Sequence, residues 1–386
     1  MASQQRLYPT TTGVGLRDLG PSLVPLARNI AGIGLPILRA KNPVFVTWAV
    51  TEACNLGCAH CSMNRPLKDE LDHAQRLEMA RKLAASDAWG VSLIGGEPLL
   101  VEGLWEYARI LKEGGKQVFV GTSGDRLGRF VDQILDIGLD VVTVSIEGSS
   151  AEAHDAFRRR TGLFGRILDA TDAITARRTG NHPRLQARCT INRLNFREID
   201  RIIDFWQQHV DNVLVQVVQN NCLHQPRDMS CVFQPEDRAE FEDIYAGLRA
   251  RYPFLTGRYY DLLPRYVFEP DQLYKDIGFR CLLVPATSVI LEANGKVKLC
   301  HGRPDSELGS LVDTSLDYLW QSDHAAMART NMQSKEYDCM CWESSYARNL
   351  DLVDLARYAD MAHHYETVMG KVGSLIGARG ARTSDR

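Results

Sequence analysis

The stretch VFVTWAVTEACNLGCAHC, at positions 44–61, joins an apolar run directly to three cysteines. The run at 44–51 has the length and the β-branched content of a buried strand. Cys54, Cys58 and Cys61 follow it, with three and then two residues between them. Such a loop can place three thiolates at three corners of a 4Fe–4S cube and leave the fourth iron without a protein ligand. The sequence therefore predicts a metal cluster after the first strand, with one corner open to a substrate or cofactor.

Zinc and unliganded core thiols are the alternatives to an iron–sulfur cluster in this loop. Zinc normally takes four protein ligands in a structural site, and His60, directly before Cys61, is poorly placed to be the fourth. The chain has ten cysteines, and residues 1–12 are polar, without a signal-peptide pattern. Without a secretion signal, thiols are expected in a reducing compartment, where metal or catalytic roles are commoner than disulfides. We therefore expect a cytoplasmic protein.

Outward from the cysteine loop, short apolar runs alternate with segments of helix length. The predicted strands are 44–51, 91–95, 117–121, 140–147, 185–192 and 212–219. The predicted helices between them are 71–85, 104–113, 127–137, 163–176 and 198–209. Strands separated by helices in this way are typical of successive βα units on a parallel sheet.

Two of the predicted strands carry a polar face. In the first, the polar side chains that share a face are Thr143, Ser145 and Glu147. In the second, they are Gln186, Arg188, Thr190 and Asn192. A parallel sheet covered on both faces is apolar on both, so these faces indicate a curled sheet around a polar cavity. An edge strand with one solvated face is the alternative for either strand alone. We predict an α/β fold, a partial (β/α)6 barrel similar to a TIM barrel.

Together with the cysteine loop, several strand ends resemble the radical S-adenosylmethionine (SAM) enzymes. Gly95-Gly96-Glu97-Pro98 ends the second predicted strand, and Thr122-Ser123-Gly124 follows the third, with Ser123 where that family has Asn. The fourth strand, the stretch at 154–164 and the fifth strand continue the resemblance, in the family's order, over 45–220. The resemblance implies a 4Fe–4S cluster on Cys54, Cys58 and Cys61 with SAM on its open iron. It further implies a 5′-deoxyadenosyl radical that abstracts a hydrogen atom from an unactivated C–H bond.

The same resemblance implies which residues contact SAM. Glu97, with the backbone of Gly95 and Gly96, would hold the methionine amino group, because a carboxylate suits an ammonium. Glu147 is either a contact to the ribose or methionine part of SAM or an ion-pair partner inside the barrel. Arg158 either reaches the carboxylate of SAM or belongs to a solvated basic turn. The complete set of candidates is Gly95, Gly96, Glu97, Ser123, Ser145, Glu147, Arg158, Thr190 and Asn192.

A second cysteine set lies in the C-terminal part, around a predicted hairpin whose turn is at 293–295. Its members are Cys281, Cys300, Cys339 and Cys341. The stretch 278–345 looks like the twitch form of the SPASM family of auxiliary-cluster domains. That resemblance implies a small α+β domain whose four thiolates hold an auxiliary 4Fe–4S cluster, which serves as an electron relay. Only Met340 separates the last two cysteines, which departs from related domains, and zinc on the same four thiols stays open.

The remaining segments complete a five-part organisation. We expect an N-terminal segment at 1–43, the barrel at 44–235 and a connecting helix with an aromatic segment at 236–277. The cluster domain follows at 278–345, and a C-terminal helix with a basic tail at 346–386. The apolar stretch at 19–38 is interrupted by charge and prolines, so no transmembrane segment is expected.

The expected activity is modification of an inert C–H bond. The 45 basic and 48 acidic side chains give no global basic field, so no nucleic-acid partner is expected. The family resemblance implies a small natural-product intermediate, such as a sugar, or a ribosomal peptide as substrate. It also implies an electron donor such as flavodoxin or ferredoxin. No residue is assigned as catalytic acid, base or hydrogen donor. The alternative is a non-catalytic zinc- or cluster-binding redox or regulatory protein.

Overall fold

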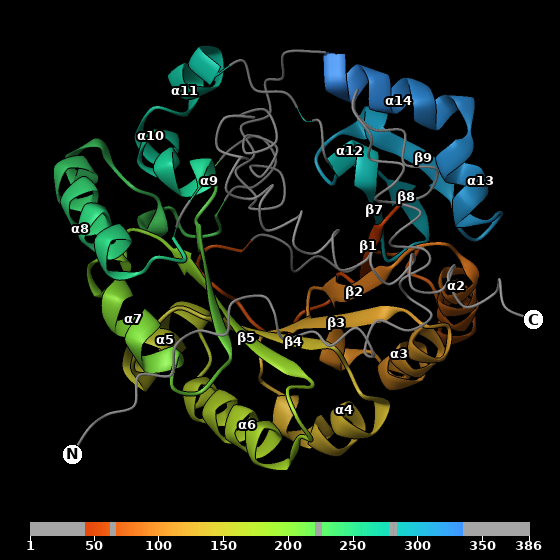
Figure 1. The fold of residues 1–386 in the computed structure, drawn as a ribbon, viewed down its shortest axis with the longest axis horizontal. Helices are drawn as coiled ribbons and strands as arrows, with labels where there is room; N and C mark the ends of the chain where they lie inside the picture. The colour runs from red at the N-terminus through yellow and green to blue at the C-terminus, as the bar shows by residue number, and fades with distance from the viewer. Residues whose placement is uncertain are drawn as a thin grey trace, which may run out of the picture.

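Six parallel strands with helices between them form the first part of the chain, as Figure 1 shows. The computed structural model describes residues 43–61, 67–220, 226–255, 257–277, 281 and 284–334. The six strands are β1 (Phe45–Thr51), β2 (Gly90–Gly95), β3 (Gln117–Thr122), β4 (Val141–Ile146), β5 (Arg184–Ile191) and β6 (Asn212–Val217). Each lies within one residue or two of its predicted bounds, because each is a short apolar run bounded by turn residues.

The strands belong to one open, nine-stranded sheet of order β6-β5-β4-β3-β2-β1-β7-β8-β9. All neighbours from β6 to β1 are parallel, and β1 also pairs in parallel with β7 (Ser288–Leu291). The last two strands, β8 (Lys296–Lys298) and β9 (Glu307–Ser310), are antiparallel to their neighbours. The predicted partial barrel is confirmed. The C-terminal strands extend the barrel sheet directly, which local sequence patterns do not reveal because β1 and β7 are far apart in the chain.

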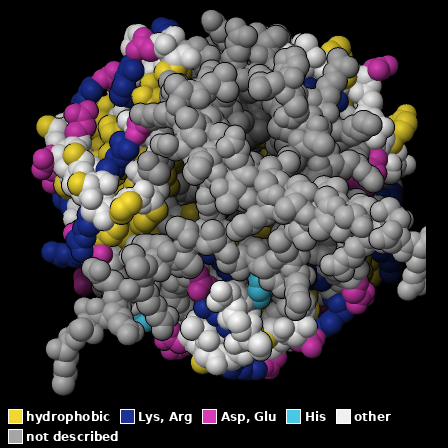
Figure 2. All heavy atoms as spheres, in the orientation of Figure 1, with side chains coloured by type: hydrophobic (Ala, Val, Ile, Leu, Met, Phe, Trp, Pro, Cys, Tyr) yellow, Lys and Arg dark blue, Asp and Glu magenta, His cyan; other side chains and the backbone are white. Residues whose placement is uncertain are grey.

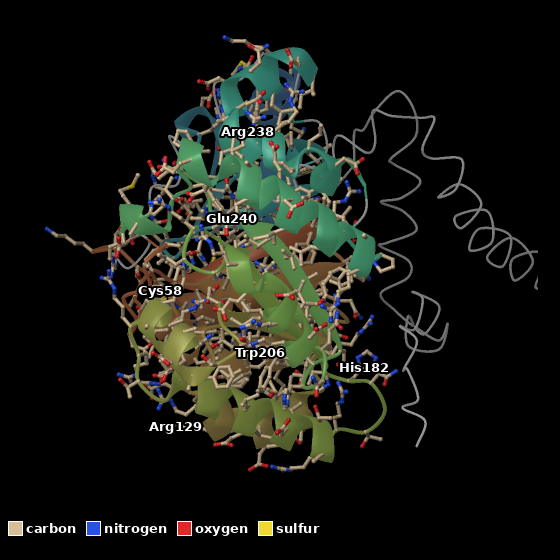
Figure 3. All side chains as sticks on the ribbon, turned by 90° about the vertical axis from the view of Figure 1, so that its left-hand side faces the viewer. Cys58, Arg129, His182, Trp206, Arg238 and Glu240 are labelled. Atoms are coloured by element: carbon tan, nitrogen blue, oxygen red, sulfur yellow. The ribbon has the colours of Figure 1, made fainter. Side chains whose placement is uncertain are left out.

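Helices cover the convex side of the barrel strands (Figure 1). They are α2 (His73–Ala85), α3 (Leu104–Glu113), α4 (Val131–Ile137), α5 (Ala151–Arg158), α6 (Leu163–Arg177) and α7 (Ile199–Trp206). Helix α7 buries Ile199, Ile202, Ile203 and Trp206, which recur at the spacing of one helix face. Trp206, labelled in Figure 3, and Cys189 of β5 are both fully buried.

The region after β6 contains more helix than the single connecting helix that the sequence predicts. The predicted helix is present as α8 (Arg238–Arg251), and three short helices follow, α9 (Arg258–Asp261), α10 (Leu263–Phe268) and α11 (Pro270–Ile277). Helices this short are marginal from local propensity alone, so the sequence pattern does not reveal them. Helix α5 was missed for the same reason. Tertiary contacts hold the segment: the Tyr260 hydroxyl donates to the Val215 carbonyl of β6 at 3.4 Å.

The C-terminal part of the described chain packs two helices beside the hairpin. After the short α12 (Val284–Thr287) and the β7–β8 hairpin come α13 (Leu316–Gln321) and α14 (Asp323–Ser334). Side chains of both charges are interspersed on the described surface in Figure 2. Within the described residues, no helix has the length and apolar character needed to cross a bilayer. The predictions for 1–42 and 346–386, and for Cys339 and Cys341, lie outside the described residues.

Candidate active site

The cysteine loop begins where β1 ends and lies against the end of β2. The amide of Gly96 donates to the Thr51 carbonyl, and the amide of Glu97 donates to the Ala53 carbonyl, each at 2.8 Å. Gly95 has a φ of +144°, and a Cβ there would lie 2.1 Å from the Thr51 oxygen. A Cβ on Gly96 would lie 2.3 Å from the Ala53 oxygen. The two glycines are therefore required for close contact between the strand end and the loop.

Hydrogen-bond donors of the kind that stabilise a thiolate face two sulfurs of this loop. The Leu56 amide donates to Cys54 Sγ over 3.4 Å, and Arg158 Nη1 donates to Cys58 Sγ over 3.5 Å. Within the described residues, no three His, Cys, Asp or Glu side chains form a group that would hold one metal ion. The ligands of a 4Fe–4S cube need not converge on one point, because each binds a different iron. Three thiols suit three irons of a cube, whereas a structural zinc ion normally takes four protein ligands.

His60 lies between the second and third cysteines and is neutral. Its ring stacks on Phe157 with the centroids 5.2 Å apart. Burial, with a smaller contribution from nearby Arg158, lowers the pKa of His60 to about 3. Its Nδ1 is buried and has no hydrogen-bond partner among the described residues. A buried polar atom without a partner, beside the cysteines, fits a site that receives a further ligand.

Glu97 is fully buried and joins the end of β2 to the end of β3. Its Oε1 accepts hydrogen bonds from the Thr122 hydroxyl at 2.7 Å and from the Leu99 amide at 3.0 Å. Its Oε2 accepts from the Ser123 amide at 2.8 Å and from the Ser123 hydroxyl at 2.5 Å. These four donors occupy the lone-pair positions of the carboxylate. The structure thus brings together the predicted site residues Glu97 and Ser123.

Glu147 and Arg158 form a buried ion pair beside Cys58. Arg158 Nε and Nη2 donate to the two oxygens of Glu147, the Nη2 bond measuring 2.8 Å. Burial raises the pKa of Glu147 and opposes the charge of Arg158, while Glu147 and Cys58 together raise the pKa of Arg158. Of the two expected roles of Glu147, the structure shows the ion pair. Arg158 is buried, so the interpretation as part of a solvated turn is wrong.

The polar residues at the end of β5 are held mostly by one another. Gln216 Nε2 donates to Thr190 Oγ1 at 3.1 Å. Asn192 is fully buried, and its amide donates to the Thr190 carbonyl at 2.8 Å. Asn195, which sequence reasoning missed, donates to the carbonyls of Glu147 and Thr190 at 3.2 and 3.1 Å. Its position in an Asn-containing turn after a strand is the feature that would have indicated this role.

Asp125 is a second residue that sequence reasoning missed. It follows Gly124 at the end of β3, and its side chain is 4% exposed. Asn55, inside the cysteine loop, donates to Asp125 Oδ2 at 2.6 Å. Arg160 and Arg166 form ion pairs with the same carboxylate at 3.1 and 2.9 Å. Asp125 therefore joins the cysteine loop to the connection between α5 and α6.

The second cysteine set is described in part. Cys281 and Cys300 are both buried and flank the β7–β8 hairpin, while Cys339 and Cys341 lie outside the described residues. The Cys300 amide donates to Ser306 Oγ at 3.2 Å, which fixes the backbone at this cysteine. The four-ligand arrangement stays a prediction.

Comparison with protein families agrees with these strand-end features. Residues 48–205 match the radical SAM superfamily, and residues 281–343 match the SPASM iron–sulfur cluster-binding domain. Residues 48–205 are therefore a radical SAM domain, and residues 281–343 are a SPASM domain. The cofactors of the chain are accordingly a 4Fe–4S cluster and SAM, with auxiliary iron–sulfur binding in the SPASM domain.

Similar proteins have several different products. The chain is 30% identical over 172 residues to the AdoMet-dependent heme synthase of Methanosarcina barkeri, covering 44% of this chain and 48% of that one. It is 30% identical over 165 residues to the sporulation killing factor maturation protein SkfB of Bacillus subtilis, covering 42% and 39%. It spans about a third to a half of the first curated relatives.

A solved structure shares the fold. SuiB of Streptococcus suis with bound SAM superposes with a TM-score of 0.58 at 13% identity, over 81% of this chain and 72% of that one.

Proposed function

We propose that this chain is a radical SAM enzyme that abstracts a hydrogen atom from an unactivated C–H bond. The substrate is a small natural-product intermediate or a ribosomal peptide. The observation that carries the proposal is the cysteine loop at the carboxyl edge of an open parallel sheet, packed against Gly95 and Gly96 and touched by Arg158. When bound, the cluster would supply the one-electron chemistry by which SAM becomes a source of a hydrogen-abstracting radical.

The residues of the strand ends hold and orient the cofactors. Cys54, Cys58 and Cys61 bind three irons of the cluster. The backbone of Gly95 and Gly96 binds the methionine ammonium, and the negative charge of Glu97, fixed by its four donors, attracts it. Because Glu97 uses its lone pairs internally, its effect on the ammonium is electrostatic.

The residues at the ends of β4 and β5 bind the rest of SAM. Arg158 has five N–H groups, and its bonds to Glu147 and Cys58 use three of them. The other two suit the SAM carboxylate. Ser145, half-buried on the concave face, and Thr190 face the ribose and adenine side, and Asn192 holds the Thr190 backbone in place.

The SPASM domain carries the second cluster in this proposal. Cys281, Cys300, Cys339 and Cys341 would hold an auxiliary 4Fe–4S cluster, which would supply an electron relay. A small acidic electron carrier, such as flavodoxin or ferredoxin, supplies the electron that the first cluster consumes. The range of substrates follows from the relatives, which include a heme synthase and a maturation protein.

Anaerobic reconstitution tests the proposal. With iron, sulfide, dithionite and SAM, we expect about eight irons per chain and formation of 5′-deoxyadenosine. Replacing Cys54, Cys58 and Cys61 together with Ala should abolish the nucleoside, while Cys189→Ala, a buried thiol outside both sets, should retain it. If the triple variant still forms 5′-deoxyadenosine, or if the wild type binds zinc instead of iron, the proposal fails.

A further inference from the structure

Arg188 lies in the middle of β5, on the concave face of the sheet. Its neighbours along the strand, Ala187 and Cys189, are buried towards the helices, so Arg188 points the other way. Strand β5 is internal, paired with β4 on one side and β6 on the other (Figure 1). The Arg188 side chain is nevertheless exposed. An exposed side chain at this position opens onto the inside of the partial barrel.

The surroundings of Arg188 on this face are neutral. Ser145 of β4 and Leu214 of β6 lie directly beside it in register. Along β5, Gln186 is bonded to Thr143 at 3.2 Å and Thr190 to Gln216 at 3.1 Å. Among the described residues, no carboxylate or other acceptor is hydrogen-bonded or ion-paired to the Arg188 guanidinium. Glu147, two residues after Ser145 in the chain, is already engaged by Arg158.

Among the described residues, Arg188 has no counter-charge. Its side chain is exposed and keeps its water, so it needs no partner within the fold, unlike the buried Arg158. The polar neighbours hydrogen-bond to each other across the strands, Thr143 to Gln186 and Gln216 to Thr190. These bonds connect the strands and do not neutralise the charge of Arg188. The position thus keeps one positive charge available inside the barrel.

We propose that Arg188 binds the anionic group of the substrate, a carboxylate or a phosphate. This deepens the proposed function and rests on it. A planar guanidinium binds either oxyanion through two parallel N–H···O bonds, and the hydroxyl of Ser145 and the amide of Gln186 can add single bonds. Arg188 is two residues before Thr190, so the anion sits about 6–7 Å below the carboxyl edge of the sheet. The substrate would then extend from this anchor towards the edge that carries the cysteine loop.

Anion titrations of the full chain test this assignment. Pyrophosphate and succinate serve as phosphate and carboxylate probes, with binding followed by isothermal titration calorimetry. We expect the wild type to bind at least one of them, and Arg188→Gln to weaken that binding by about tenfold or more. Arg188→Lys should recover part of the affinity. Which probe binds more tightly identifies the anion.

Arg129→Gln is the matched control, because Arg129 is an exposed arginine on the outer surface (Figure 3). It should leave the affinity unchanged. Equal binding by the wild type and Arg188→Gln, or no binding of either probe to the wild type, would overturn the assignment. So would loss of SAM binding in Arg188→Gln, which would make the cofactor the anion. Formation of 5′-deoxyadenosine without substrate should survive in Arg188→Gln. If the wild type itself forms none, the proposed function fails, whatever the anion result.

Discussion

Two buried carboxylates close the strand ends of this sheet, and they are stabilised by different means. Glu97, between β2 and β3, accepts four hydrogen bonds from neutral groups. Glu147, after β4, receives the charged fork of Arg158, which also donates to Cys58. The first arrangement fixes the shape of the backbone around the glycines. The second couples a carboxylate to a cysteine of the cluster loop, so its loss should affect both stability and the cluster.

The largest expected effect is at Arg158. Replacement by Met leaves Glu147 buried without a counter-charge, and we expect a loss of about 3–5 kcal/mol in the free energy of unfolding. Denaturant titration of the reconstituted chain under anaerobic conditions measures it. Glu147→Met combined with Arg158→Met should cost clearly less than the sum of the two single variants. Additive losses would show that the pair is not the coupled unit that the structure describes.

The same arginine should also influence the cluster. Arg158→Lys keeps the charge near Glu147 but loses the fork that reaches Cys58. A hydrogen bond to a thiolate ligand stabilises the reduced cluster. Because this variant loses that bond, the reduction potential should become more negative. Potentiometric titration followed by electron paramagnetic resonance measures this. An unchanged potential would show that Arg158 does not influence the cluster and acts only in its ion pair with Glu147.

A smaller effect is expected at Glu97, where no charge partner is lost. Glu97→Gln turns one acceptor oxygen into an NH₂ group that faces buried donors, and should cost about 1–3 kcal/mol of stability. The matched control is Glu113→Gln, an exposed glutamate at the end of α3, with an expected change within about 0.5 kcal/mol. Thermal or denaturant unfolding measures both. Equal costs for the two variants would contradict the four-donor arrangement.

Asp125, which follows β3, should make the free energy of unfolding depend on pH. Burial opposes its ionisation, but bonds from Arg160, Arg166 and Asn55 lower its pKa below the ordinary 3.8. A lowered pKa in the folded state means that the stabilisation is present above pH 3.8 and is lost as the pH falls through the folded value. Because both arginines are substantially exposed, we expect Asp125→Asn to cost only about 1 kcal/mol at neutral pH. In unfolding experiments below pH 3.8 the difference from the wild type should shrink. A constant difference would rule out the ionised carboxylate as its cause.

The sequence predicts the elements that depend on local patterns. Six strands follow from apolar runs, and the cysteine loop follows from its spacing. The pairing of β7 with β1 is a contact between distant segments, which no local period indicates. The Glu147–Arg158 pair stayed one of two alternatives because burial decides between them, and burial depends on how α5 packs. Asp125 was missed because its partners, Asn55, Arg160 and Arg166, are far from it in the sequence.

The smallest expected stability effect is at Arg188, and it sharpens the comparison between paired and unpaired charges. Arg158 ends helix α5 and Arg188 lies in β5, and of the two only Arg158 has a counter-charge among the described residues. Arg188→Gln should therefore change the free energy of unfolding by no more than about 0.5 kcal/mol, in the assay used for Arg158. A charge that contributes nothing to folding and yet occupies an internal strand is available for a ligand. A cost above about 1 kcal/mol would instead indicate a partner within the fold, and would remove the physical reason for a substrate anion at this position.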